Sequence, residues 1–180
     1  DFLQNNPVEF IIDNFYLIII SALFFGFLMA YGIGANDVAN AMGTSVGSKA
    51  LTLTQALVIA SIFTFMGAYF AGAEVTTTIK ENIVPPELFK DDPSIFILGM
   101  LSSLLAAGSW LLLATMFGWP VSTTHSIIGA IAGFSIYYIG WSSVRWGYIG
   151  GVTITWLIVP FVAAVLSGLI YSSAKRLIIK

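Results

Sequence analysis

Long apolar runs alternate with short polar segments along this chain, and five runs are long enough to be candidate membrane segments. A transmembrane helix needs about 20 mainly apolar residues to cross a hydrocarbon core of about 30 Å. The runs cover Phe15–Ile33, Leu53–Ala73, Ile95–Phe117, Val121–Ile139 and Tyr148–Ser172. This pattern predicts an all-α, polytopic helical membrane protein, with residues 1–180 forming a single transmembrane domain.

The composition excludes several classes of protein. Hydrophobic residues make up 58% of the chain and charged residues only 9%, whereas about a quarter of the residues in soluble domains are charged. The expected surroundings are therefore a lipid bilayer. A net charge of −2 offers no basic surface for nucleic acid, and the absence of cysteine excludes thiol catalysis and cysteine-ligated metals.

The charges between the runs predict how the chain is oriented. Lys and Arg favour cytoplasmic loops. Lys49 and the basic C-terminus are therefore expected inside, and the N-terminus outside. Residues 74–93 carry more acidic than basic side chains and are expected to form an extracellular loop. The predicted location is the plasma (inner) membrane.

A polar stretch, Gly32–Ser45, follows the first apolar run. Its glycines weaken a helix, and Asn36 or Asp37 could cap a helix that restarts there. A carboxylate at membrane depth costs about 2.5 to 3.5 kcal/mol and usually marks an ion path. The alternative is a cytoplasmic loop before Lys49, in which Asp37 is solvated.

A second polar stretch, residues 118–126, separates two apolar arms. Pro120 ends the incoming helix, and Ser122 or Thr123 can cap the next one. A helix N-terminus lined with hydroxyls binds anions without lysine or arginine. We expect a re-entrant helical hairpin that exposes this tip to a pathway; the alternative is a short cytoplasmic turn.

Enzymatic chemistry is not indicated. His125 is the single histidine and cannot build a metal site by itself. The chain also has no glycine-rich nucleotide loop and no Ser-His-Asp order with a plausible base. We therefore expect neither catalysis nor a cofactor.

Three motifs together resemble the inorganic phosphate transporter (PiT) family. They are GANDVANAMGTSVGS at residues 34–48, ASIF at 60–63 and GWPVSTTHSIIGAIAGF at 118–134. The resemblance implies cation-coupled symport of inorganic phosphate with sodium or a proton, although related bacterial members carry sulfate. It also implies that the chain is the N-terminal repeat of an inverted-repeat transporter. The second repeat would be on the same or another chain, and a homodimer is an expected assembly.

The resemblance also assigns roles to individual residues. Ser122, Thr123 and Thr124 match the hydroxyl cluster that binds the anion, and Asp37 matches the essential aspartate. Asn36 and Asn40, together with Asp37 and Thr123, would hold sodium, helped by backbone carbonyls freed at a break in the helix. One position departs from the pattern, because Thr64 stands where many animal members have glutamate.

If Asp37 contacts the anion directly, proton chemistry predicts a preference for phosphate over sulfate; if Asp37 binds sodium instead, that discrimination disappears. Phosphate keeps at least one proton at neutral pH, and Asp37 can accept a hydrogen bond from that P–OH group, whereas sulfate has no proton to donate. Two alternatives remain: a permease for sulfate or another oxyanion, and a phosphate-sensing membrane subunit that does not transport.

Overall fold

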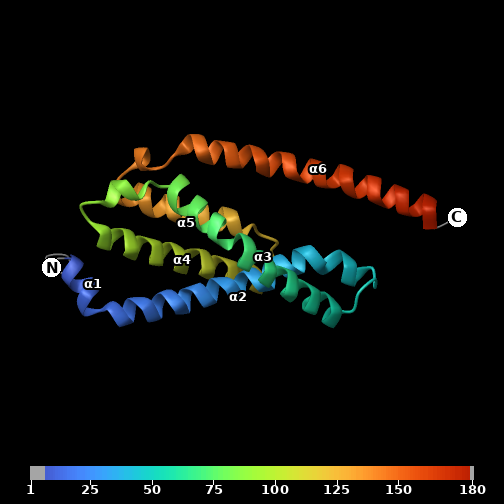
Figure 1. Cartoon of the computed structure of the whole chain (residues 1–180), viewed down its shortest axis with the longest axis horizontal. Coiled ribbons are helices and arrows are strands. Elements are labelled where there is room, and N and C mark those ends of the chain that lie inside the picture. The colour runs from blue at the N-terminus through green and yellow to red at the C-terminus, as the bar shows by residue number, and fades with distance from the viewer. Residues whose placement is uncertain (1–6, 179–180) are drawn as a thin grey trace. The chain divides into compact units, whose positions relative to one another are not determined.

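The computed structural model describes residues 7–178, and their regular secondary structure is helical (Figure 1). In chain order the elements are α1 (Pro7–Asp13), α2 (Phe15–Gly47), α3 (Leu53–Asn82), the 3₁₀ helix η1 (Pro86–Phe89), α4 (Pro93–Met116), α5 (Thr123–Tyr138), the 3₁₀ helix η2 (Trp141–Ser143) and α6 (Trp146–Ile178). The predicted all-α class is confirmed.

Four helices in the described part of the chain are long and apolar enough to cross a membrane: α2, α3, α4 and α6. The fifth predicted segment is the shorter helix α5, whose 16 residues span about 24 Å, less than the hydrocarbon core. This length is compatible with one arm of a hairpin. The re-entrant path itself remains a prediction.

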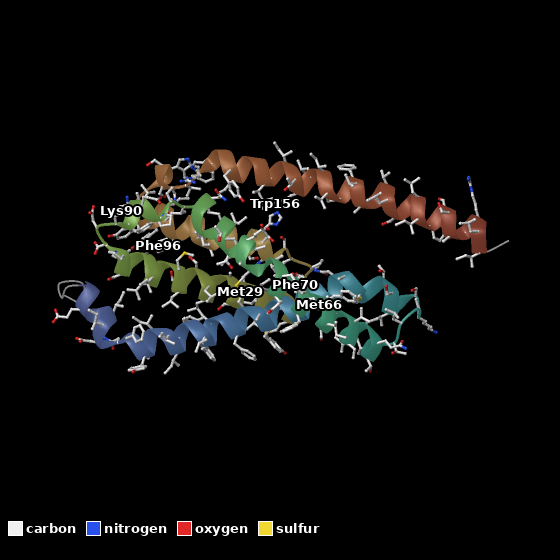
Figure 2. All side chains as sticks on the ribbon, viewed as in Figure 1. Met29, Met66, Phe70, Lys90, Phe96 and Trp156 are labelled. Atoms are coloured by element: carbon white, nitrogen blue, oxygen red, sulfur yellow. The ribbon has the colours of Figure 1, made fainter. Side chains whose placement is uncertain are left out.

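The outer surfaces of these helices are strongly apolar. Met66 and Phe70, labelled in Figure 2, lie on α3 and are 43% and 76% exposed. Large apolar side chains on a surface are expected where lipid replaces water as the solvent. The exposed faces therefore agree with an integral membrane protein.

The expected interruption after Ile33 is wrong. Helix α2 runs without a break through the whole Gly32–Ser45 stretch, so no carbonyl is freed there and neither Asn36 nor Asp37 caps a second helix. The alternative of an irregular loop is wrong for the same reason. A glycine costs a helix about 1 kcal/mol, and the buried contact that Gly32 makes with Leu111 of α4 offsets that cost.

Helices α2 and α4 run parallel and pack closely through two glycines. A methyl group on Gly108 would lie 3.3 Å from the backbone nitrogen of Met29, and one on Gly32 would lie 2.9 Å from the Cβ of Leu111. From Met29 to Gly32 and from Gly108 to Leu111 both helices advance by the same number of residues, so the two contacts belong to one register. This register places Asn36, one turn after Gly32, level with the end of α4.

Helix α5 folds back along α4. The Ser103 hydroxyl of α4 lies 2.8 Å from the carbonyl of Gly99 and 3.2 Å from the carbonyl of Ala130 in α5. A glycine is required at position 99 because a Cβ there would overlap the ring of Phe134. Phe134 also stacks on Phe89 of η1, with ring centroids 5.5 Å apart. These contacts hold α4 and α5 as a tight antiparallel pair (Figure 1).

The connection between α4 and α5 starts with a glycine-dependent helix end. Gly118 has a φ of +66°, which a residue with a side chain adopts at a cost. The Trp119 amide donates to the Ala114 carbonyl at 2.8 Å and the Gly118 amide to the Thr115 carbonyl at 3.1 Å, which is the Schellman pattern of helix termination. Pro120 follows and prevents the helix from continuing.

The segment expected as an extracellular loop, 74–93, is partly helical. Helix α3 extends to Asn82 and η1 occupies Pro86–Phe89. Ile83, Val84 and Phe89 are buried, so this connection packs against the protein. Its side of the membrane remains a prediction.

Residues from Arg145 onward form a second unit, separate from the unit that ends at Val144. It contains α6, which encloses the predicted segment Tyr148–Ser172 and has Pro160 in its interior. Lys175 and Arg176 lie in its last turn, where cations interact favourably with the helix dipole.

Candidate anion and cation site

The candidate site forms where the 117–122 connection meets helix α2. Asn36, which is 5% exposed, donates from Nδ2 to the Trp119 carbonyl at 2.9 Å. Its Oδ1 accepts a hydrogen bond from the Val121 amide at 3.3 Å. These two bonds bring together the two polar stretches of the sequence.

Asp37 and Thr123 form the next contact between the same two elements. The Thr123 hydroxyl donates to Oδ2 of Asp37 at 3.2 Å, and both residues are half-buried. Thr123 is the first residue of α5. A carboxylate therefore lies beside the positive end of a helix, an arrangement that favours negative charge.

The start of α5 is capped by a hydroxyl. Ser122 is the N-cap, and its Oγ accepts from the His125 amide at 3.3 Å. The Ser122 carbonyl accepts from the Ser126 amide at 3.2 Å and from the Ser126 hydroxyl at 2.9 Å. Ser122 and Thr124 are exposed, so their side chains are accessible beside the backbone N–H groups of the first turn.

The predicted site residues thus fall into two groups. Asp37 and Thr123 interact directly between α2 and α5. Asn36 bonds the backbone of the connection that precedes Thr123, and Asn40 donates to Oδ1 of Asn36 at 3.0 Å. Ser122 and Thr124 flank Thr123 at the start of α5. Thr64, the position that departs from the family pattern, lies on α3 and is exposed.

A cavity of about 290 Å³ lies beside this contact. It is lined by Ala35, Asn36, Ala39, Asn40, Thr115, Gly118, Trp119 and Pro120. Thr115 was not predicted from the sequence, because a single threonine inside an apolar helix carries no distinguishing signal. The backbone of Trp119 was also missed, because the motif letters do not reveal which carbonyl faces α2.

The chemistry available here is that of neutral oxygens and one carboxylate. Residues 7–178 contain no cluster of three or more His, Cys, Asp or Glu side chains suited to a metal ion. A hard cation such as sodium is instead suited to oxygen ligands. The side-chain oxygens of Asp37, Asn40 and Thr123, on α2 and α5, are candidates for such ligands.

Comparison with known proteins shows which proteins this chain is similar to. The sequence pattern of the Phosphate transporter family matches residues 33–180. A putative phosphate permease of Haemophilus influenzae is 54% identical over 163 residues, covering 91% of this chain and 39% of the relative. Inorganic phosphate transporter 2-1, chloroplastic, of Arabidopsis thaliana is 46% identical, covering 88% of this chain and 27% of the relative.

A solved structure shares the fold. It is described as the sodium-dependent phosphate transporter and superposes with a TM-score of 0.80 at 41% identity. The match covers 89% of this chain and 40% of that protein. The chain therefore spans about two fifths or less of the length of these relatives.

Proposed function

Because this chain belongs to the phosphate transporter family, we propose that the protein carries inorganic phosphate across a membrane by cation-coupled symport. The observation that carries the proposal is the hydrogen bond between Asp37 and Thr123 at the start of α5. It joins a proton-accepting carboxylate to a helix terminus suited to anions. The family and the structural relative are transporters rather than enzymes.

The anion would bind at the first turn of α5. Hydroxyls of Ser122 and Thr124, and that of Thr123 when it turns from Asp37, would donate to the unprotonated phosphate oxygens, together with the N–H groups of this turn. Asp37 would accept from the protonated oxygen. A sulfate ion offers no such proton, so this arrangement supports phosphate over the alternative of a sulfate or other oxyanion permease.

The coupling cation would bind next to the anion. Its oxygen ligands would come from among Asn36, Asn40, Asp37 and Thr123, the four residues that the resemblance implies, with sodium favoured over a proton by similarity to a protein described as sodium-dependent. Opposite charges attract strongly where the dielectric constant is low. Each ion would therefore raise the affinity of the other, and such mutual affinity is reciprocal.

The proposal also includes the orientation of the chain in the membrane and its pairing with a second repeat. The N-terminus would face outside and the C-terminus the cytoplasm, with residues 74–93 outside, in a plasma (inner) membrane. The chain would pair with a second, inverted repeat on the same or another chain, and the complete unit could form a homodimer. Inverted repeats place the shared substrate site at their interface.

Uptake into proteoliposomes tests the function directly. The complete protein containing this chain should accumulate radiolabelled phosphate when an inward sodium gradient is imposed, and much less with potassium in place of sodium. A proton gradient applied without sodium serves as the control for the coupling ion. Phosphate binding without uptake under any gradient would instead indicate a phosphate-sensing subunit, and preferential uptake of sulfate would indicate the oxyanion alternative.

Replacing Thr123 with Val should weaken phosphate transport. The change removes the hydroxyl that donates to Asp37 while keeping the side-chain shape, so we expect the KM for phosphate to rise about tenfold, the value of one hydrogen bond to a charged group. Thr77→Val on the exposed face of α3 is the matched control, since its hydroxyl donates to the Ala73 carbonyl of the same helix, at 3.0 Å. An unchanged KM in Thr123→Val would remove this residue from the anion site.

A further inference from the structure

The side chain of Asn36 forms hydrogen bonds with the backbone on both sides of Pro120. Its Nδ2 donates to the carbonyl of Trp119, the residue before the proline, and its Oδ1 accepts from the amide of Val121, the residue after it. The side chain is 5% exposed. It therefore contacts the connection between α4 and α5 from inside the protein, through backbone groups that any residue at 119, and any residue except proline at 121, would supply.

An amide side chain is well suited to this pair of bonds. An amide carries donor and acceptor groups in one plane, as a backbone peptide does, whereas an ionised carboxylate can only accept. Pro120 has no N–H group of its own. Aspartate at position 36 would keep the bond from Val121 but place a carboxylate oxygen against the Trp119 carbonyl.

The acceptor oxygen of Asn36 is fully used. A carbonyl oxygen has two lone pairs, and Oδ1 accepts from both the Val121 amide at 3.3 Å and Nδ2 of Asn40 at 3.0 Å. A cation could bind this oxygen only by displacing one of these donors. Displacing Val121 would release the segment that presents Thr123 to Asp37.

We propose that Asn36 is a positioning residue for the anion site and not a sodium ligand. It holds the 119–121 backbone against α2, so that Thr123, two residues later, stays within hydrogen-bond distance of Asp37, the residue next to Asn36. This assignment rests on the proposed phosphate site, and it narrows the cation ligands to Asp37, Asn40 and Thr123.

The geometric part can be tested without any ligand. Gly43 on α2 and Gly129 on α5 are exposed, and an added Cβ meets nothing within 4 Å at either position. Cysteines at both positions, in a complete protein otherwise free of cysteine, can carry spin labels for a pulsed distance measurement. We expect Asn36→Asp to broaden or shift the α2–α5 distance distribution, and Asn82→Asp, at the end of α3, to leave it unchanged.

Measurements of phosphate and sodium binding distinguish a positioning role of Asn36 from a role as a sodium ligand. In detergent-purified complete protein, Asn36→Asp should weaken phosphate binding about tenfold or more, since it disrupts a buried hydrogen-bonded pair. Sodium binding measured without phosphate should become no tighter, because Thr123, one of the remaining cation ligands, also depends on Asn36 for its position. A sodium ligand would behave in the opposite way, because a carboxylate in place of an amide strengthens the attraction for a cation.

Two results would overturn the proposal. One is an unchanged distance distribution between the spin labels in Asn36→Asp, regardless of the phosphate and sodium affinities. The other is phosphate-free sodium binding that becomes about tenfold tighter while the phosphate affinity stays unaltered. If the unmutated protein binds no phosphate, the proposed function fails, while the label distances still decide whether Asn36 holds the connection in place.

Discussion

Replacing Asp37 with Asn is expected to reduce sodium-driven phosphate uptake by about tenfold to a hundredfold, the value of a buried hydrogen bond to a charged group. The change is nearly isosteric but removes the negative charge beside Thr123. It also replaces one of the two acceptor oxygens with a donor, so the P–OH group of phosphate loses a partner. Uptake of labelled phosphate and sulfate into proteoliposomes measures the effect.

The selectivity of the same variant separates two roles for Asp37. If the carboxylate contacts the anion, the ratio of phosphate to sulfate uptake should fall in Asp37→Asn, because repulsion of the unprotonated ion is lost. Asp91→Asn, an exposed position between η1 and α4, controls for the loss of one negative charge. A variant that loses sodium stimulation but keeps the selectivity ratio would place Asp37 at the cation alone.

Enlarging Gly108 should disable the site from a distance. An added Cβ would lie 3.3 Å from the Met29 backbone nitrogen, and a backbone atom cannot rotate away as a side chain does. Gly108→Leu should therefore push α2 from α4, with a cost of about 1 to 3 kcal/mol or more for overpacking. The Asn36 and Asp37 contacts depend on that register, so phosphate transport should be nearly abolished.

Substitutions of different size at Gly108, with a control at Gly67, show whether the loss of uptake comes from overpacking between α2 and α4. Gly108→Ala requires a shift of only a few tenths of an ångström and should retain partial uptake. Gly67→Leu on the exposed face of α3, where an added Cβ meets nothing within 4 Å, should behave as the unmutated protein. Thermal unfolding in detergent, measured alongside uptake, reports the packing cost. Equal stability and equal uptake in Gly108→Leu would show that the α2–α4 contact does not position the site.

The sequence predicted the class of the protein and the residues of interest from local signals. The apolar run lengths identified the helices, and the resemblance carried by the residue 34–48 and 118–134 motifs is confirmed by the family match over residues 33–180. Ser122 was expected as a possible cap and is the N-cap of α5. These inferences succeeded because helix length, helix capping and sequence motifs are determined by residues close together in the sequence.

The expected break in α2 failed for a tertiary reason. Glycine and asparagine lower helix propensity, and propensity alone favoured an interruption at Gly32–Ser45. In the structure Gly32 is the point of close approach to Leu111, and Asn36 bonds the connection after α4 instead of its own backbone. Residues that weaken an isolated helix here serve the packing of two helices.

By itself the sequence determined that this is a helical membrane protein with two polar stretches that bilayers disfavour. Only the tertiary structure decided that the two stretches meet. The meeting depends on the parallel register of α2 and α4, set by Gly32 and Gly108, and on the turn at Gly118 that directs α5 back along α4. Both are contacts between distant segments, and no local pattern of residues specifies which pairs of such segments will pack together.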